Sequence, residues 1–481
     1  MKVLFAAAEV APFSKAGGLA DVVGSLPKYL EKDAEIAIFT PLHGLINKEK
    51  FKIKELENSD LWLTFNGNGH RFKLFMTKLP GTKINVFFVQ NDWYFSCFKE
   101  VYPKWLDPEY EHERYIAFSL AVMEYAKLLN FRADVIHAND WHTAMIPVYL
   151  HSNYRFDEFW ANTKTVFEIH NLAYQGVWFE NVLDFANMRK DIVYNEWCVE
   201  HYGRVNWMKG AINYSDRVVA VSPTYAREIL TGEYGEGMDY TLRGAQYKLR
   251  GILNGIDYDE FNPKKDKSLV KNYDVKSLDK KEENKKFICK YFGLEYNPER
   301  PLFVMISRLV PQKGIDLIRD AENVLRNMDA DFIFLGSGNS DYENLLIWLS
   351  NNTPNIRAYI GYNAELANKI YAASDFYLMP SAFEPCGLSQ LIAMRYGSLP
   401  VVRATGGLED TVTGYPLDNS TGFKFWGYNA QAMIDAINCA LYVYKDKYTF
   451  NAMRKSAMEA DFSWKKSSAE YLKMYRELCG K

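Results

Sequence analysis

The chain has 481 residues, more than a single hydrophobic core usually serves, so we expect two domains of a couple of hundred residues each. A formal net charge of −3 and a hydrophobic content of 48% argue against a nucleic-acid coat or a membrane-surface protein. The six cysteines lie far apart without a Cys-x-x-Cys pair, which predicts neither disulfides nor a structural zinc site. No apolar run has the length of a membrane span or of a signal-peptide core, so we expect a cytoplasmic protein.

The first half of the chain alternates strand-like and helical runs, a pattern typical of a doubly wound parallel sheet. The expected strands are residues 2–8, 36–39, 84–89, 135–138, 163–169 and 217–221. Residues 47–83, rich in Lys, Gly and alternating aromatic side chains, predict an inserted hairpin region. An Asn-Gly turn within 249–262, followed by a rise in charge density from residue 264, predicts a domain boundary.

A glycine-containing loop, Ser14 to Gly18, lies between the first strand and the first helix. Its two glycines let the backbone turn tightly and approach a ligand, and Lys15 supplies a cation at the helix N-terminus. The loop matches neither a P-loop nor a G-x-G-x-x-G motif, and a plain turn is the alternative interpretation.

Polar clusters follow two of the expected strands, at residues 137–142 (His-Ala-Asn-Asp-Trp-His) and at residues 169–176. Polar groups just past the carboxyl ends of parallel strands line the ligand crevice of such sheets. Three histidines could indicate a metal, but His137 and His142 are five positions apart across a turn and match no zinc motif. We therefore interpret these side chains as hydrogen-bonding groups.

A second α/β block has expected strands at residues 302–306, 332–335, 356–360, 376–379 and 399–402. Arg308 and Lys313 follow the first of these strands, five residues apart, a spacing at which both could converge on a diphosphate. Two solvated loop cations are the alternative. Tyr362 follows the third strand, where it could stack on a nucleobase or, alternatively, be half-buried in the core.

Glu384 lies in the loop between strand 376–379 and an apolar helical run, 391–396. The helix should begin with free backbone N–H groups at residues 387–389, a site for a phosphate oxygen. Because a carboxylate beside a phosphate is electrostatically unfavourable, we expect Glu384 to bind sugar hydroxyls or to stabilise positive charge at the reacting centre. A capped turn with a solvated Glu384 is the alternative.

Eight segments of the chain resemble, in the same order, the bacterial glycogen synthases and the plant starch synthases. They are residues 15–22, 137–142, 169–176, 253–257, 307–309, 312–314, 383–388 and 405–408. The resemblance runs from Lys2 to about Leu478 and implies the α/β architecture called GT-B. This has two Rossmann-like doubly wound domains, an interdomain cleft and a C-terminal crossover helix. The implied domains are residues 1–255 plus 462–481, on the acceptor side, and 256–461, on the donor side.

The resemblance implies a retaining glucosyltransferase that transfers glucose from ADP-glucose to the non-reducing end of an α-1,4-glucan such as glycogen. It implies no metal, no cofactor, and no nucleic-acid or membrane partner. A starch synthase, a UDP-glucose-using enzyme and a non-catalytic glucan-binding protein are the alternatives. The last is disfavoured because a binding protein has no use for diphosphate-neutralising cations. Ile392, where many retaining enzymes of this architecture carry a second Glu, counts against sucrose synthase or trehalose-type enzymes.

Carried over by position, Arg308 and Lys313 would neutralise the donor diphosphate, and Glu384 would bind and orient the glucose. His170 would contact the glucose from the opposite wall, and Asp140 would lie near the acceptor and the sugar. The other donor-binding positions would supply backbone N–H groups, a cation near the phosphates, and contacts to the base and nucleotide. They are Lys15, Gly17, Gly18, Tyr362, Cys386, Gly387, Leu388 and Ser389.

Overall fold

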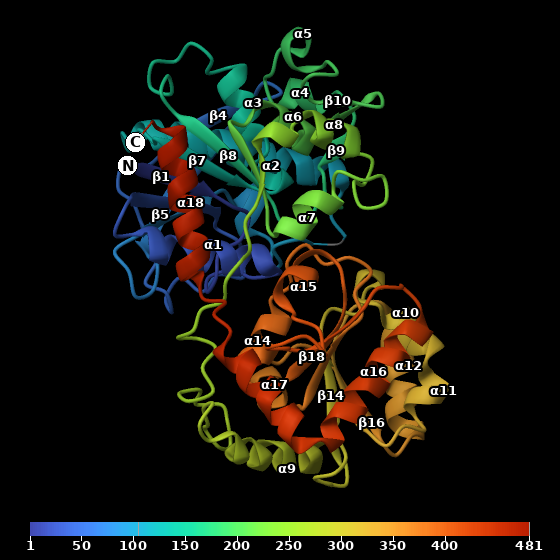
Figure 1. The fold of residues 1–481 in the computed structure, drawn as a ribbon. Coiled ribbons are helices and arrows are strands. Elements are labelled where there is room, and N and C mark those ends of the chain that lie inside the picture. Colours follow the sequence, from blue (N-terminus) through green and yellow to red (C-terminus); the bar gives the residue numbers. More distant parts are fainter. Residues whose placement is uncertain (104, 481) are drawn as a thin grey trace. The chain divides into compact units, whose positions relative to one another are not determined.

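The computed structural model describes residues 1–103 and 105–480, which fold into two compact units (Figure 1). Unit 1 comprises Met1–Gly255 and Trp464–Lys481, and unit 2 comprises Ile256–Ser463. Each unit has its own hydrophobic core built around a largely parallel sheet. Among the described residues, no helix is both long enough and apolar enough to cross a lipid bilayer.

The main sheet of unit 1 has the strand order β13-β12-β8-β7-β1-β2-β6-β5-β3, with β4 paired to β5. The seven strands from β13 to β6 run parallel. Their bounds are β1 (Lys2–Ala6), β2 (Glu35–Pro41), β6 (Asn85–Gln90), β7 (Val135–Asn139), β8 (Lys164–Ile169), β12 (Arg217–Ala220) and β13 (Leu249–Gly251). The inner strands are buried almost throughout, as expected of parallel strands covered on both faces.

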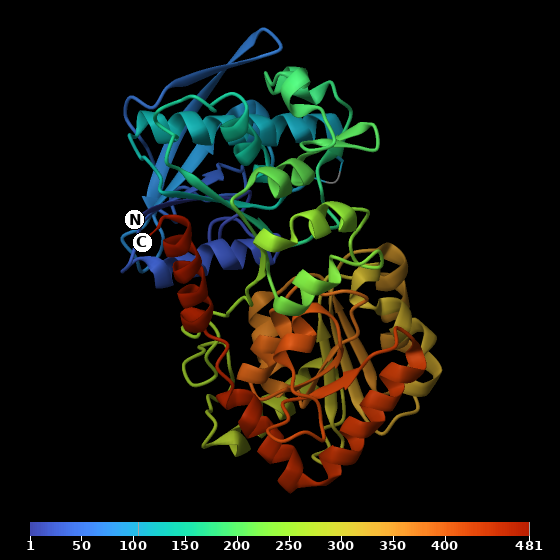
Figure 2. The same cartoon turned by 45° about the horizontal axis from the view of Figure 1, so that its top comes forward.

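The inserted hairpin region expected from the sequence is confirmed. Strands β3 (Lys54–Glu55), β4 (Leu61–Phe65) and β5 (Asn68–Lys78) pair antiparallel, and β5 joins the parallel sheet through β6. Figure 2 shows this hairpin, in blue, extending away from the parallel strands. A separate small sheet contains β9 (Val177–Trp178), β10 (Glu200–His201) and β11 (Arg204–Asn206).

The helices of unit 1 cover its parallel sheet, and the last of them comes from the far end of the chain. After passing through unit 2, the chain returns to unit 1 as α18, which packs beside α1 (Figure 1). Trp464, Tyr471 and Tyr475 of α18 are fully buried in the core of unit 1. The helices are α1 (Gly18–Leu30), α2 (Pro108–Leu128), α3 (Met145–His151), α4 (Val182–Phe185), α5 (Lys190–Val193), α6 (Trp207–Tyr214), α7 (Pro223–Glu228), α8 (Asp239–Gly244) and α18 (Trp464–Leu478).

The sheet of unit 2 is wholly parallel, with the order β16-β15-β14-β17-β18-β19. Numbered within the unit this is 3-2-1-4-5-6, the order of a dinucleotide-binding Rossmann sheet. The strands are β14 (Leu302–Ile306), β15 (Asp331–Gly336), β16 (Ile356–Ile360), β17 (Phe376–Met379), β18 (Leu399–Arg403) and β19 (Phe423–Phe425). The doubly wound fold expected from the sequence is confirmed in both units.

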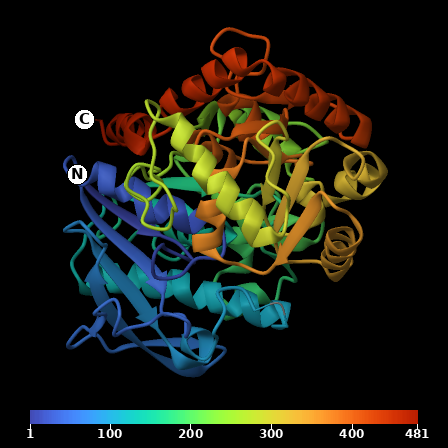
Figure 3. The ribbon, with the colours of Figure 1, turned by 90° about the horizontal axis from the view of Figure 1, so that it is seen from below.

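Helices lie on both faces of the unit 2 sheet (Figures 1 and 3). They are α9 (Lys281–Phe292), α10 (Ile315–Asp320), α11 (Glu322–Leu325), α12 (Ser340–Asn352), α13 (Ala364–Ala373), α14 (Ser389–Arg395), α15 (Gly406–Thr411), α16 (Ala430–Lys445) and α17 (Lys447–Glu459). At the start of the unit, the backbone N–H of Asp259 donates to Asp257 Oδ1 at 2.9 Å, an Asx-turn interaction.

Each parallel sheet has one point at which the strand order reverses. In unit 2 the two neighbouring strands β14 and β17 flank that point, and in unit 1 the strands β1 and β7 do so. The crossovers leave in opposite directions there, so the loops at the carboxyl ends of the two strands leave an open crevice between them. These two pairs of loops carry most of the site residues expected from the sequence.

A buried ion pair lies at the amino-terminal ends of strands β14 and β17, opposite the switch-point loops. Lys285 Nζ, on α9, lies 2.8 Å from Asp375 Oδ2, and both side chains are less than a tenth exposed. Asp375 Oδ2 also accepts a hydrogen bond from the Leu302 backbone N–H at 2.9 Å. Burial alone would raise the pKa of Asp375, but the Lys285 and Arg454 cations and the Leu302 N–H together outweigh that effect and hold the pKa below its ordinary value.

We expect Asp375→Ala to lower the free energy of unfolding of unit 2 by about 3–5 kcal/mol, because it leaves the Lys285 ammonium buried without a counter-ion. Urea-induced unfolding would measure the loss. Glu283→Ala on the same helix is the matched control, because the Glu283–Lys286 pair is about half exposed and should contribute less than about 1 kcal/mol. Equal losses in the two variants would contradict the assignment.

Candidate functional site

Two loops of unit 2 meet at its switch point and bind each other through the backbone. One follows β14 and the other follows β17. The Ala382 N–H donates to Gln312 O at 2.9 Å, and the Gln312 side-chain amide donates to Phe383 O at 3.2 Å. Gly314 has φ +74°, and a Cβ there would lie 2.1 Å from Pro380 O. Only glycine therefore allows this close approach of the two loops.

The approach places Lys313 beside Glu384. Lys313 Nζ lies 2.6 Å from Glu384 Oε2, and the Ser381 hydroxyl donates to the same oxygen at 3.0 Å. Both charged side chains are largely buried, at 14% and 8% exposure. The interpretation of Glu384 as a solvated residue of a capped turn is therefore wrong. The sequence did not single out Ser381, which lies three positions before Glu384.

A cavity of about 150 Å³ opens next to this ion pair. Polar side chains from both loops line it, together with the buried strand ends of β14 and β17; the polar members are Ser307, Arg308, Lys313, Tyr377, Ser381 and Ser389. The Arg308 guanidinium is exposed and forms no hydrogen bond or ion pair with the described residues. The two cations expected to converge thus border one cavity, and Arg308 is available to an anion there.

Three backbone N–H groups lie at the start of α14, where Ser389 lines the same cavity. Those of Gly387, Leu388 and Ser389 donate no hydrogen bond to any residue within 1–103 and 105–480. Gly387 has φ +73°, a conformation that favours glycine. Cys386, the residue before them, is buried. The loop therefore presents three unused donors next to a cation-lined cavity.

The Glu384 loop is supported from β18 and α15, a role that the sequence did not reveal. Arg403 donates to Ala382 O and, at 3.1 Å, to Trp426 O, and the Gly407 N–H donates to Glu384 O at 3.1 Å. A Cβ at Gly406 would lie 1.9 Å from Glu384 O. In the sequence this support is marked by the adjacent glycines Gly406 and Gly407, a pair typical of a tight turn.

Tyr362 lies apart from this cavity. It follows β16, which is separated from β14 by β15, and its side chain is 78% exposed. The alternative of a half-buried core tyrosine is therefore wrong. Tyr362 does not line the cavity, although its exposed ring remains available for stacking.

In unit 1, the loop after β1 is organised by Glu9, which sequence reasoning missed. This buried carboxylate accepts hydrogen bonds from the backbone N–H groups of Ala16 and, at 3.2 Å, Gly17. Burial raises the pKa of Glu9 to about 7. Lys15 Nζ lies 2.6 Å from Asp21 Oδ1. The Gly17 N–H is therefore already engaged, whereas the Gly18 N–H has no acceptor among the described residues.

Asp140, in the loop after β7, combines burial with unusual backbone angles. Its φ of 54° and ψ of −179° are values that non-glycine residues rarely adopt, at a cost of about 1–3 kcal/mol. Its Oδ1 accepts from the backbone N–H groups of His170, at 2.8 Å, and Asn171, at 3.3 Å. Burial raises the pKa of Asp140 to about 6. Asp140 thus joins the loop after β7 to the loop after β8.

His170 is held beside Asp140 by a second contact between the same loops. Its Nε2 lies 2.9 Å from Asn139 Oδ1. His137 and His142 are both buried, and burial holds the pKa of His142 well below its ordinary value, so His142 is neutral. In the described parts of the chain, no three His, Cys, Asp or Glu side chains are grouped so that they could hold a metal ion.

Two protein families match this chain. The starch synthase catalytic domain matches residues 2–244, and the group 1 glycosyl transferases match residues 292–456. The chain is 42% identical to a glycogen synthase of Thermosipho melanesiensis over 486 residues, covering 100% of both proteins. It is 43% identical to a glycogen synthase of Thermotoga maritima over 490 residues, covering 100% of this chain and 99% of that protein.

Solved structures agree with these relatives. The catalytic domain of Starch Synthase IV from Arabidopsis thaliana, bound to ADP and acarbose, matches with a TM-score of 0.92 and 32% identity, covering 100% of this chain and 99% of that one. A sucrose-phosphate synthase from Thermosynechococcus elongatus, at 16% identity and a TM-score of 0.61, shares the fold alone. The chain therefore belongs to the glycogen and starch synthase family of GT-B glycosyltransferases, and the glycogen synthase function expected from its sequence is confirmed.

Proposed function

We propose that this glycosyltransferase transfers glucose from ADP-glucose to the non-reducing end of an α-1,4-glucan, with retention at the anomeric carbon. The observation that carries the proposal is the loop pair at the unit 2 switch point. It combines an unpaired Arg308, three unused backbone N–H groups and a lysine-paired Glu384. The similar starch synthase catalytic domain, which was solved with bound ADP and acarbose, supports the same donor and acceptor classes.

The donor diphosphate would bind where the cations and N–H donors of unit 2 adjoin the cavity. Arg308 offers a planar, permanently charged fork for phosphate oxygens, and the N–H groups of residues 387–389 offer uncharged donors. Lys313 would stabilise the negative charge that develops on the departing nucleotide. Lys313 and the backbone N–H groups are held by the loops before the substrate arrives, so the transition state need not reorganise them.

Glu384 would bind the glucosyl hydroxyls and would not act as a covalent nucleophile. Lys313 and Ser381 both contact its Oε2, so one oxygen is already engaged. A double displacement in glycosidases uses a second acid about 5 Å away, whereas no carboxylate is among the described side chains that line the cavity beside Glu384. Departure and attack on the same face, with the leaving phosphate accepting the proton of the acceptor hydroxyl, fits these residues better.

Unit 1 would supply the other sugar contacts. His170 would hydrogen-bond the glucose, and Asp140 would fix the His170 backbone and lie near the acceptor hydroxyl. Lys15 and the Gly18 N–H would lie near the donor phosphates, Tyr362 near the base, and Cys386 near the nucleotide. We further propose a cytoplasmic enzyme that needs no metal or cofactor; its six cysteines form no disulfide among the described residues, which suits a reducing compartment.

Initial rates with ADP-glucose and UDP-glucose at equal concentration, with glycogen as the acceptor, test the proposed donor. We expect a clear preference for ADP-glucose and release of ADP only when the glucan is present. A preference for UDP-glucose would overturn the donor assignment and leave glucan extension intact. No nucleotide release with either donor would favour the non-catalytic glucan-binding alternative.

Arg308→Ala should reduce kcat about a hundredfold to a thousandfold, because it removes a positive charge that would stabilise the leaving group. Folding should be unaffected, since the side chain is exposed and has no partner among the described residues. Arg319→Ala, which removes an exposed arginine of α10 in the same unit, is the matched control and should keep full activity. A near-normal rate for Arg308→Ala would place this residue outside the reaction.

The raised pKa of Asp140 predicts that kcat/KM for the donor falls on the acid side of its pH profile, a fall called the acid limb below. Because burial raises this pKa to about 6, kcat/KM for the donor should fall roughly tenfold per pH unit below about pH 6 and level off above it. Asp140→Asn keeps an oxygen for the His170 and Asn171 N–H groups but removes the charge. Residual activity of that variant should lack the limb; an unchanged limb would assign it to another group, such as Glu9.

The raised pKa of Asp140 also makes the free energy of unfolding depend on pH. The folded state holds the Asp140 proton more tightly than the unfolded chain between about pH 4 and pH 6, so this group's contribution to stability is lost as the pH rises through that window. The stability difference between wild type and Asp140→Asn should therefore change with pH in that window and be constant below it, as measured by urea unfolding.

A further inference from the structure

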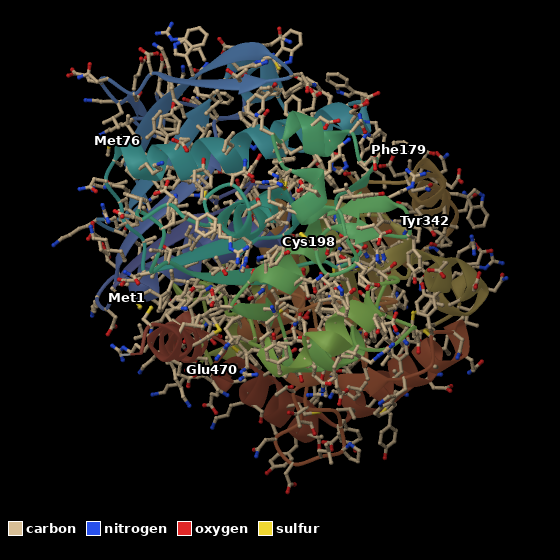
Figure 4. All side chains as sticks on the ribbon, turned by 90° about the horizontal axis from the view of Figure 1, so that it is seen from above. Met1, Met76, Phe179, Cys198, Tyr342 and Glu470 are labelled. Atoms are coloured by element: carbon tan, nitrogen blue, oxygen red, sulfur yellow. The ribbon has the colours of Figure 1, made fainter. Side chains whose placement is uncertain are left out.

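A row of buried polar side chains connects the C-terminal helix to His170 inside unit 1. The Tyr475 hydroxyl on α18 lies 2.6 Å from His137 Nδ1 on β7, and His137 Nε2 lies 2.7 Å from Glu168 Oε2 on β8. Glu168 Oε1 is then 3.6 Å from His170 Nε2. Tyr475, His137 and Glu168 have no solvent exposure. Figure 4 labels Glu470 on α18, five residues before Tyr475.

The hydrogen bonds of Asn139 determine which nitrogen of His170 carries the proton. The Asn139 amide nitrogen donates to Ala6 O at 3.1 Å and to His137 O at 3.2 Å, so its oxygen must face His170. His170 Nε2 therefore carries the proton that Asn139 Oδ1 accepts. His170 Nδ1, which has no partner among the described residues, is left for a sugar hydroxyl.

Glu168 is an ionised acceptor at the centre of the row. Burial alone would raise its pKa, but the nearby imidazoles of His170 and His137 and a hydrogen bond from Tyr471 hold the pKa below its ordinary value. A carboxylate can only accept, so His137 Nε2 carries a proton that faces Glu168. His137 Nδ1 accepts the Tyr475 O–H when the imidazole is neutral and donates to the Tyr475 oxygen when it is protonated. In either state the Tyr475 hydroxyl is the partner that holds the His137 ring through Nδ1.

Removing the Tyr475 hydroxyl would leave His137 Nδ1 without its hydrogen-bond partner. His137 could then shift its proton to the other nitrogen or rotate, and Glu168 would lose its donor from β7. The carboxylate lies close enough to His170 Nε2 to compete with Asn139 for that proton. The His170 ring would rotate away from the position in which Nδ1 is open to the sugar.

We propose that Tyr475 and Glu168 are positioning residues for His170, so that the docked helix α18 forms part of the sugar-binding site of unit 1. The inference rests on the proposed role of His170 in glucosyl transfer. The proposal means that the position of the His170 ring depends on residues that are distant in the sequence. The last helix of the chain, reached only after unit 2, fixes a side chain in the loop after β8.

A double-mutant cycle on the full-length enzyme tests the proposal. Tyr475→Phe should reduce kcat/KM for ADP-glucose about tenfold to a hundredfold, the size of effect expected when a substrate-contacting group is misplaced by about 1 Å. In a His170→Ala background the same substitution should have no further effect, because its route to the substrate is gone. Glu168→Gln, which keeps the side-chain shape, should behave in the same way.

Tyr125→Phe is the matched control. Tyr125 is another buried tyrosine of unit 1 whose hydroxyl makes one hydrogen bond, to Ser59 O at 3.0 Å. Tyr125→Phe should leave kcat/KM unchanged. If it does lower kcat/KM, the same factor should also appear in the His170→Ala background. The ¹⁵N chemical shifts of the His170 ring in labelled protein should change with Tyr475→Phe and Glu168→Gln, and not with Tyr125→Phe.

The outcomes separate the two levels of inference. If His170→Ala is severely impaired while Tyr475→Phe and Glu168→Gln resemble the control, or add fully to His170→Ala, the positioning role is overturned and the proposed function stands. If His170→Ala has full activity, the proposed role of His170 fails and the positioning role with it. If Tyr475→Phe does not fold, Glu168→Gln decides by the same cycle and the same ¹⁵N shifts.

Discussion

The ion pair between Lys313 and Glu384 is the interaction on which the unit 2 site depends. An isolated carboxylate beside a phosphate-binding cavity would repel the ligand, and an isolated ammonium in the same place would be costly to bury. At 2.6 Å the two groups neutralise each other, so Glu384 can lie next to the N–H groups of α14 without opposing an anion. Arg308 needs no such partner because it is exposed, and it remains available to the diphosphate.

This pair exists because of the sheet topology. Lys313 and Glu384 are 71 positions apart, but they follow β14 and β17, the two adjacent strands at which the strand order of unit 2 reverses. Unit 1 uses the same arrangement, with the Lys15 loop after β1 and Asp140 after β7. In each unit the crossovers leave in opposite directions, so the two loops are not covered by a connecting helix. The same constraint thus produces a candidate site in each Rossmann-like unit.

Close backbone packing keeps these loops in place. Gly314 lies against Pro380 O, and Gly406 lies against Glu384 O, at distances that leave no space for a Cβ. In unit 1 the support is polar: Glu9 binds the N–H groups of the glycine-containing loop, and Asp140 binds those of His170 and Asn171. Both carboxylates are buried and have raised pKa values, as carboxylates often do at functional sites.

The sequence alone determined the alternation of strands and helices, the inserted hairpin, and the residue types that follow each strand. Local periodicity is enough for these features, because a buried parallel strand needs a continuous apolar run and its loop needs glycine or polar residues. Eight ordered motifs also identified the family. Tertiary structure decided which side chains meet: Ser381 and Lys313 on Glu384, Glu9 on Gly17, and Arg403 beneath the Glu384 loop. It also placed Tyr475 on His137, although 338 positions separate them. Such contacts depend on strand order and on the return of α18 to unit 1, which no local pattern of residues encodes.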